Sequence, residues 1–195
     1  SKAFEMAGDT SHKVFGVMGD STFFHSGMTG LANAVFNKHD VLLVILDNGT
    51  TAMTGHQPNP GVCTSVLGEG CNHLDIESVV RGIGVTDVAK VKPFNMRGTL
   101  KTIEEMKARS GVRVIIAEEP CMLFARRTLK QNRPQVAEVA TQGEEALKCL
   151  AELACPAFRR GGTAEAPVVS VDESQCSGCM VCLQVTPAIR ARKRS

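Results

Sequence analysis

The chain has 195 residues, of which 43% are hydrophobic and 22% charged, and 22 Lys and Arg against 20 Asp and Glu leave a net charge of +2. This composition is typical of a globular protein with one large domain or with a medium domain and a small one. The near-neutral charge favours no nucleic-acid partner, and the longest aliphatic run, Val41 to Leu46, is far shorter than the roughly 20 residues of a membrane-spanning helix.

Alternating strands and helices are predicted for the first part of the chain. Residues 13–18 are a short, mostly apolar strand candidate, and residues 26–38 carry apolar side chains at helical spacing. Residues 41–46 form a continuous apolar run, which is typical of a strand buried on both faces. Further along, the pattern predicts a helix near 74–83, a strand near 85–91, a helix at 99–109 capped by Thr99 and a strand at 112–117. We therefore expect an α/β domain with a parallel sheet whose strands end at one common edge.

The character of the sequence changes beyond Pro120. A basic stretch, interpreted as a solvated face, is followed by a helical candidate at 143–154 and by a flexible segment at 161–167, and the basic end at 189–195 is interpreted in the same way. The stretch consists of Arg126, Arg127, Lys130 and Arg133. A boundary near 130–138 gives two expected domains, 1–132 and 138–195.

Cysteines are concentrated in the second part, where five of the eight lie between Cys149 and Cys182. The N-terminus lacks the apolar core and cleavage site of a signal peptide, so we expect a cytoplasmic protein, in which clustered thiols usually bind metal. Cys63, Cys71 and Cys121 have no partner at metal-ligand spacing and are interpreted as buried or free thiols.

Two polar turns follow the first two predicted strands. Gly19-Asp20-Ser21 comes after the first, and Asp47-Asn48-Gly49-Thr50 comes after the second. Neighbouring parallel strands bring these ends together, where open α/β sheets bind ligands. A carboxylate beside amide and carbonyl oxygens suits Mg²⁺, which takes further ligands from water and phosphate. The two turns together predict a Mg²⁺ diphosphate site, although a Gly-Asp turn alone is more often ordinary turn chemistry.

The run from Gly19 to Gly61 resembles the diphosphate-binding (PP-type) domain of thiamine-diphosphate enzymes. Their signature is GDG followed at a distance by NN, and here GDS and DN are separated by 25 residues. More narrowly, STFFHSG and TTAMTGHQPNPG resemble the 2-oxoacid:ferredoxin oxidoreductases that act on indolepyruvate. The resemblance covers most of residues 10–125 and continues into the cysteine-rich tail.

This resemblance implies roles for the residues of the two turns. Asp20 and Asn48 would give side-chain oxygens to Mg²⁺, Thr50 would give its main-chain oxygen, and Gly19 and Ser21 would shape the turn that binds the cofactor. The family commonly has a larger basic residue at position 49, so Gly49 departs from the pattern.

His25 and His56 lie within the matching segments. Histidine is the usual proton carrier near neutral pH, so each either lines the cofactor pocket in a catalytic role or makes a structural hydrogen bond in its loop. Both alternatives stay open, whereas His12, His39 and His73 are expected at the surface.

An iron–sulfur motif stands near the C-terminus. Cys176, Cys179 and Cys182 form C-x2-C-x2-C, the start of the bacterial run that closes with x3-C-P, but the closing position is Thr186. Upstream, Cys155-Pro156 closes a second copy whose third ligand is Cys149 and whose first two positions fall on Gly143 and Ala146. Zinc is less consistent with this motif, because its structural sites usually use two separated pairs of ligands.

In two-cluster ferredoxins the fourth Cys of each run ligates the other cluster. Cys155, Cys176, Cys179 and Cys182 therefore form one complete set, while the other set retains only Cys149. We expect a small α+β ferredoxin-like domain with one [4Fe–4S] cluster, where the resemblance alone suggests two; a decayed tail without a cluster is the alternative.

The family resemblance implies oxidative decarboxylation of 2-oxo acids, such as indolepyruvate and other arylpyruvates, with the acyl group passing to coenzyme A and electrons passing through the cluster to ferredoxin. The second α/β domain that activates the aminopyrimidine does not fit in this length and is expected on a missing portion or another subunit. Two alternatives stay open. One is a non-redox thiamine-diphosphate decarboxylase or ligase with a vestigial tail, and the other is a ferredoxin-like electron carrier without thiamine chemistry.

Overall fold

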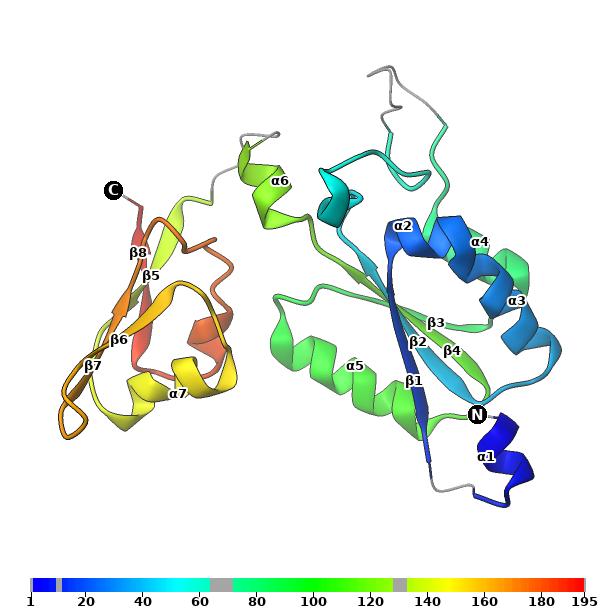
Figure 1. The fold of residues 1–195 in the computed structure, drawn as a ribbon, viewed down its shortest axis with the longest axis horizontal. Helices are drawn as coiled ribbons and strands as arrows, with labels where there is room; N and C mark the ends of the chain where they lie inside the picture. Colours follow the sequence, from blue (N-terminus) through cyan, green and yellow to red (C-terminus); the bar gives the residue numbers. More distant parts are fainter. Residues whose placement is uncertain (1, 10–11, 64–71, 128–132, 195) are drawn as a thin grey trace. The chain divides into compact units, whose positions relative to one another are not determined.

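The computed structural model describes residues 2–9, 12–63, 72–127 and 133–194. The chain divides into two compact units, Ser1–Ala125 and Arg126–Ser195, which are described separately (Figure 1). The division falls within the short helix α6 (Met122–Arg127), slightly before the boundary expected near 130–138.

A four-stranded parallel sheet forms the centre of the first unit. Its strands are β1 (Val14–Gly19), β2 (Val41–Asp47), β3 (Asp87–Val91) and β4 (Val112–Glu118), in the order β1-β2-β4-β3 (Figure 1). Every neighbouring pair is parallel, and Gly19 lies opposite Leu46 at the end of the first pair. The expected α/β architecture with a parallel sheet is confirmed, and the strands end at one edge.

Helices cover both faces of this sheet. On one face, a helical stretch of three parts, α2 (Asp20–Thr22), a π-helix (Phe23–Gly27) and α3 (Met28–Phe36), packs together with α4 (Ile76–Ile83) against Leu43, Ile45, Val114 and Ile116. On the other face, α5 (Met96–Ala108) packs through Met106 against Leu42 and Ile115. Alternate residues of β2 and β4 thus enter opposite cores, which explains why both strands are apolar except for Arg113 and the acidic residue that ends each strand.

Two helix starts differ from the prediction. The helix expected at 26–38 begins directly at Asp20, so the residues after β1 are helical from the first position. The expected cap at Thr99 is wrong: α5 begins at Met96, and Asn95 caps it by accepting a hydrogen bond from the Gly98 N–H at 3.1 Å. The Thr99 hydroxyl instead donates to the Lys92 carbonyl, because it lies one turn inside the helix.

The second unit combines two antiparallel pairs of strands with short helices. In chain order it contains β5 (Gln135–Val139), α7 (Glu144–Glu152), β6 (Phe158–Gly162), β7 (Pro167–Val171), a 3₁₀ helix (Val181–Gln184) and β8 (Ile189–Lys193). The first and last strands pair, as do the two middle ones. This is a small α+β unit.

Two segments of this unit are more regular than predicted. The segment 161–167, expected to be flexible, closes the β6–β7 hairpin, where Gly162 has φ +75° and a Cβ would collide with the Ala166 carbonyl. The basic residues near the C-terminus form β8, which pairs with β5 and buries Ile189. A short helix, α1 (Lys2–Met6), precedes β1 and was not predicted. Within the described part of the chain, no helix is long and apolar enough to cross a membrane.

Candidate functional site

The carboxylate of Asp20 lies at the carboxyl end of β1 and is only 2% exposed. Its Oδ1 accepts the Ser21 N–H at 2.7 Å, and its Oδ2 accepts the side-chain amide of Asn59 at 3.1 Å. Each carboxylate oxygen has more than one lone pair, so a single hydrogen bond leaves room for a cation. The two bonds fix the carboxylate and leave it able to act as a ligand.

The turn after β2 is fixed by its own side chains. The Asn48 Oδ1 accepts the Thr50 N–H at 3.0 Å, and the Asp47 carboxylate accepts the Gly49 N–H at 3.3 Å. Gly49 has φ +70°, a conformation that side-chain-bearing residues rarely adopt. Thr50 is 2% exposed, and its hydroxyl donates to the Gln57 carbonyl at 3.4 Å. Asp20 and this turn thus lie at the ends of neighbouring strands, as predicted from the parallel arrangement.

Asp47 adds a second carboxylate beside Asp20. Burial raises the pKa of Asp47, and the nearby charge of Asp20 raises it further, while the Gly49 N–H lowers it. Two carboxylates at a partly buried edge repel one another unless a cation compensates them. Together with the oxygens of Asn48 and Thr50, this donor set has the chemistry that Mg²⁺ prefers.

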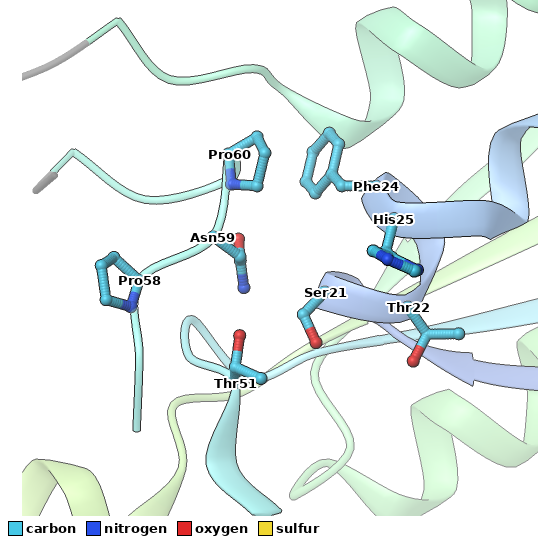
Figure 2. Close-up of a pocket in the computed structure, with 8 residues that line it drawn as sticks. All are labelled: Ser21, Thr22, Phe24, His25, Thr51, Pro58, Asn59 and Pro60. Atoms are coloured by element: carbon cyan, nitrogen blue, oxygen red, sulfur yellow. The ribbon is translucent and has the colours of Figure 1, made fainter. Parts of the chain in front are cut away.

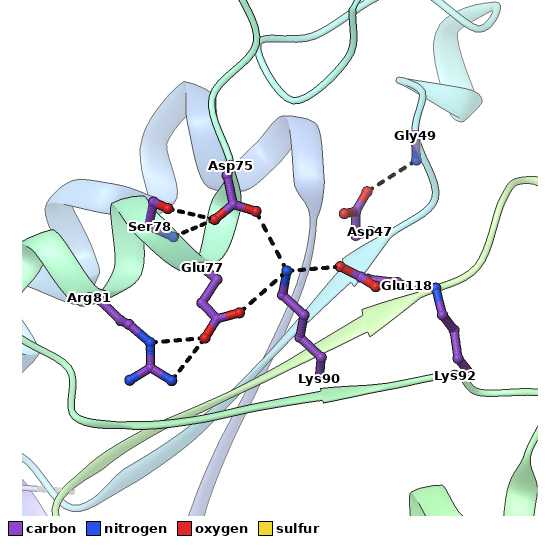
Figure 3. A network of polar contacts seen from close by, with 9 residues as sticks. All are labelled: Asp47, Gly49, Asp75, Glu77, Ser78, Arg81, Lys90, Lys92 and Glu118. Carbon is purple, nitrogen blue, oxygen red and sulfur yellow. Dashed lines mark hydrogen bonds and ion pairs between the residues drawn. The ribbon is translucent and has the colours of Figure 1, made fainter.

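A network of ion pairs surrounds Lys90 at the same end of the sheet (Figure 3). Its ammonium lies 3.5 Å from Asp75, 3.3 Å from Glu77 and 3.3 Å from Glu118. Hydrogen bonds from Ser78 lower the pKa of Asp75, and hydrogen bonds from Arg81 and Lys90 lower that of Glu77. The network connects the start of α4 with the ends of β3 and β4. Because its charges are largely solvated, the ion pairs add little to the stability of the fold, and their role is to hold these three elements in place.

A cavity of about 420 Å³ opens beside Ser21 and Asn59, the two residues that donate to the Asp20 carboxylate (Figure 2). Its walls come from the helical stretch after β1 and from the loop after β2, and they consist of Ser21, Thr22, Phe24, His25, Thr51, Pro58, Asn59 and Pro60. Hydroxyl, amide and imidazole groups thus share the cavity with apolar rings, an arrangement typical of a small-molecule site.

The two candidate histidines have different surroundings. His25 lines the cavity. His56 does not line it; its ring stacks on Phe124 with 5.4 Å between ring centroids, and its backbone has φ +65°. Its Nδ1 is buried without a hydrogen-bond partner among the described residues.

Asn59 binds the Asp20 carboxylate, although no role was assigned to it from the sequence. It lies 39 positions beyond Asp20, and its Oδ1 accepts the Gly61 N–H at 2.8 Å, so the whole amide is oriented. Its neighbours Pro58 and Pro60 restrict the backbone around it. The only signal for Asn59 in the sequence is that it belongs to the segment 50–61, which carries part of the family resemblance.

A second cavity, of about 270 Å³, lies within the second unit. Four cysteines line it together with mainly apolar residues: Cys155, Cys176, Cys179 and Cys182. The Ala137 N–H donates to the Cys176 sulfur at 3.5 Å. Two residues between the last three cysteines, Gly178 and Met180, have positive φ and produce the tight turns of this loop.

Cys149 lies outside this cavity and is fully buried in the core of the second unit. Two further positions of the incomplete ligand set are buried, Ala146 and Thr186, and the hydroxyl of Thr186 donates to Glu145 at 3.0 Å. The remaining position, Gly143, is exposed. Burial raises the pKa of Cys149 to about 11 and that of Cys182 to about 12. Among the described residues, no three His, Cys, Asp or Glu side chains converge on a single metal ion.

The other cysteines and histidines are dispersed. Cys63 is exposed and Cys121 partly buried, both with free thiols, while Cys71 lies outside the described residues. His12 and His73 are exposed, and His39 is partly buried.

Comparisons with known proteins give one family and a consistent set of relatives. The model described as "Thiamine pyrophosphate enzyme, C-terminal TPP binding domain" matches residues 3–117. A protein of Methanothermobacter thermautotrophicus described as "Indolepyruvate oxidoreductase subunit IorA" is 41% identical over 183 residues, covering 92% of this chain and 28% of its own length. Proteins of the same description from Archaeoglobus fulgidus and Thermococcus kodakarensis are 39% and 37% identical, covering 91% and 89% of this chain. The chain spans only 28% and 27% of those two relatives.

Proposed function

The chain belongs to the thiamine pyrophosphate enzyme family, and on that premise we propose that it is part of a thiamine-diphosphate-dependent 2-oxo acid oxidoreductase. The proposed reaction is oxidative decarboxylation of 2-oxo acids, arylpyruvates such as indolepyruvate among them, to acyl-CoA and CO₂. The electrons would pass through one [4Fe–4S] cluster, held by cysteines of this chain, to ferredoxin. The observation that carries the proposal is the buried carboxylate of Asp20 at the sheet edge, held beside the Asn48 turn and the cavity.

In the first unit, the proposed Mg²⁺ ligands are the side-chain oxygens of Asp20 and Asn48 and the main-chain oxygen of Thr50. Asp47 would add negative charge beside the ion, and Gly19 and Ser21 would shape the turn that receives the diphosphate. When bound, thiamine diphosphate supplies the carbanion chemistry of 2-oxo acid decarboxylation. The chain's own residues would hold the diphosphate end of the cofactor in place.

The cavity walls suit the exclusion of water and the binding of a polar ligand. Phe24, Pro58 and Pro60 would exclude water, and the hydroxyls of Ser21, Thr22 and Thr51 would offer hydrogen bonds to a polar ligand. Of the two candidate catalytic histidines, we assign proton transfer to His25, because its ring lines the cavity. His56 would support the loop through its contact with Phe124.

In the second unit, we propose that Cys155, Cys176, Cys179 and Cys182 ligate the cluster in a ferredoxin-like domain. Support comes from their arrangement around one cavity and from the Ala137 N–H at the Cys176 sulfur, since hydrogen bonds to sulfur are typical of such sites. A bound cluster accepts electrons singly. A non-redox thiamine enzyme would have no use for this cysteine-lined cavity, which makes that alternative less attractive.

The rest of the enzyme is proposed to supply the missing parts. The chain spans 28% of its relatives' length, so the second α/β domain, with the Glu that activates the aminopyrimidine, would lie elsewhere in the full protein or on a second subunit. The coenzyme A and ferredoxin sites would be assembled in that complete enzyme.

The activity can be tested with the anaerobically purified full-length protein and any accompanying subunit. We expect indolepyruvate to reduce a viologen dye only when coenzyme A and thiamine diphosphate are present, whereas residues 1–195 alone should show no turnover. Aldehyde release without dye reduction would instead support the non-redox decarboxylase, and an absence of thiamine-diphosphate binding would support the electron carrier.

Removing the Asn59 amide should weaken Mg²⁺ binding. Asn59→Ala leaves the Asp20 Oδ2 without its donor, and Asn59→Asp places a further carboxylate against it, so we expect each to raise the Mg²⁺ concentration needed for thiamine-diphosphate binding about tenfold or more. Titration calorimetry of the full-length protein measures this. Asn37→Ala, which removes an exposed amide at the end of α3, is the matched control and should have no effect.

A further inference from the structure

The loop of residues 172–176 leads to Cys176 and is held by arginines from distant parts of the chain. Arg126 donates to the Ser174 carbonyl at 3.2 Å, and Arg192 binds the Glu173 carboxylate at 2.6 Å. Arg194 makes the most extensive contacts with this loop and with the residues before β5. It donates to the carbonyls of Cys176 at 2.7 Å, Glu173 at 3.2 Å and Arg133 at 3.4 Å.

Arg194 differs from the neighbouring arginines in its partners. Arg190 and Arg192 pair with Glu138, and Arg192 also pairs with Glu173. Arg194 is half-buried, and within the described residues it pairs with no carboxylate; its three contacts are backbone carbonyls. A guanidinium remains charged at any pH at which proteins are studied. Its positive charge is therefore fixed beside Cys176, with no acidic side chain of the described residues to compensate it.

Cys176 is consequently held from two sides. The Ala137 N–H of β5 meets its sulfur, and the Arg194 guanidinium meets its carbonyl. The backbone of Arg194 is itself tied down, because its N–H donates to the Pro134 carbonyl at 2.8 Å. The guanidinium can thus fix the position of the thiol at the cavity wall.

We propose that Arg194 positions the ligand Cys176 and that its charge raises the reduction potential of the cluster, an inference that rests on the proposed [4Fe–4S] site. A cubane with four thiolate ligands carries net negative charge, and one-electron reduction adds one more negative charge without breaking a bond or moving an atom. A fixed cation nearby stabilises the reduced form more than the oxidised form. Loss of the cation should therefore make the cluster harder to reduce.

The test removes one positive charge at a time from the anaerobic full-length protein. One charge is that of Arg194, which directly follows β8, and the other is that of Arg190, which lies within β8. Arg194→Gln removes the unpaired charge beside Cys176, and Arg190→Gln removes a 66% exposed charge that is paired with Glu138. Iron content and the midpoint potential, from a dithionite titration followed by electron paramagnetic resonance, are measured for each. We expect Arg194→Gln to lower the ratio of reduced to oxidised cluster about tenfold at a given potential, equivalent to about 59 mV for a one-electron couple.

Arg190→Gln should leave this ratio within about twofold, because an exposed and paired charge is screened. Arg194→Lys keeps the charge and should keep a potential near that of the wild type, with more ready loss of iron because it cannot bind the carbonyls as a planar fork. Equal potentials for Arg194→Gln and Arg190→Gln in iron-loaded proteins would overturn this inference alone. If Arg194→Gln failed to load iron, the positioning role would be supported, and a lowered potential in iron-loaded Arg194→Lys would overturn the role of charge. A wild-type protein without iron would overturn the cluster itself.

Discussion

Asp20→Ala is expected to abolish Mg²⁺-dependent binding of thiamine diphosphate to the full-length protein. Asp20 would be the only carboxylate among the three proposed ligands, and it is held in a fixed orientation by Ser21 and Asn59. Without it, the ion keeps only neutral oxygens from this chain, so we expect affinity to fall by more than about 100-fold, beyond the effect of losing a residue that merely supports a ligand. Calorimetric titration at several Mg²⁺ concentrations measures the loss.

The fold should survive this substitution. Alanine removes a buried negative charge beside Asp47, whose pKa is raised partly by that charge, so the change relieves repulsion as well as removing two hydrogen bonds. Asp20→Asn, which keeps the size of the side chain, should lose cofactor binding too. Asp87→Asn, at the amino end of β3 and paired with Arg109, is the matched control and should bind normally. Unchanged affinity in Asp20→Ala would show that the ion is held elsewhere.

The strands of the first unit could be predicted because their signal is local. The unbroken apolar run 41–46, and the run 112–117 that is apolar except for Arg113, bury both faces, and β2 and β4 lie in the middle of the sheet. Whether β3 or β4 lies next to β2 depends on packing between distant helices, which no short segment encodes. The start of α5 was missed for a related reason: Asn95 and Thr99 are both acceptable caps, and only the backbone decides between them.

The residues of the candidate site that lie at strand ends could be predicted from the sequence, whereas the positions of those in the loop after β2 could not. Asp20 and the Asn48 turn meet because parallel strands end together. Asn59 reaches Asp20 through the path of a long loop, and the orientation of His56 follows from a left-handed backbone, so neither is encoded in residue spacing.

In the second unit, residue composition suggested less order than the structure has. The segment 161–167 has the composition of a linker, yet its Gly162 is needed by a tight hairpin. The basic C-terminal residues have the composition of a solvated tail, yet Arg194 donates to three backbone carbonyls. The cysteine spacing, in contrast, selected the four residues that line one cavity, because the ligand order of such motifs is fixed along the chain.

The final prediction concerns Cys149 and Cys155, which lie close together in the sequence. Substitution of one should remove the cluster, and substitution of the other should not. Cys155 lines the cavity with Cys176, Cys179 and Cys182, whereas Cys149 is packed in the apolar core. The anaerobic full-length protein should carry about four irons in this domain. Cys155→Ser should destroy or convert the cluster, although it lies 21 residues before the main motif, and the loss should be visible in iron content and in the absorption spectrum.

Cys149→Ser should retain the iron, because this thiol is buried in the apolar core and does not line the cavity that the four proposed ligands share. Its cost should be in stability alone, since a hydroxyl replaces a buried thiol in an apolar core. Cys149→Ala, which adds no polar group, therefore separates the two effects and should load iron as the wild type does. About eight irons, or loss of the cluster from Cys149→Ala with retention in Cys155→Ser, would contradict the ligand assignment, because a cubane needs four thiolates and only one complete set lines a cavity.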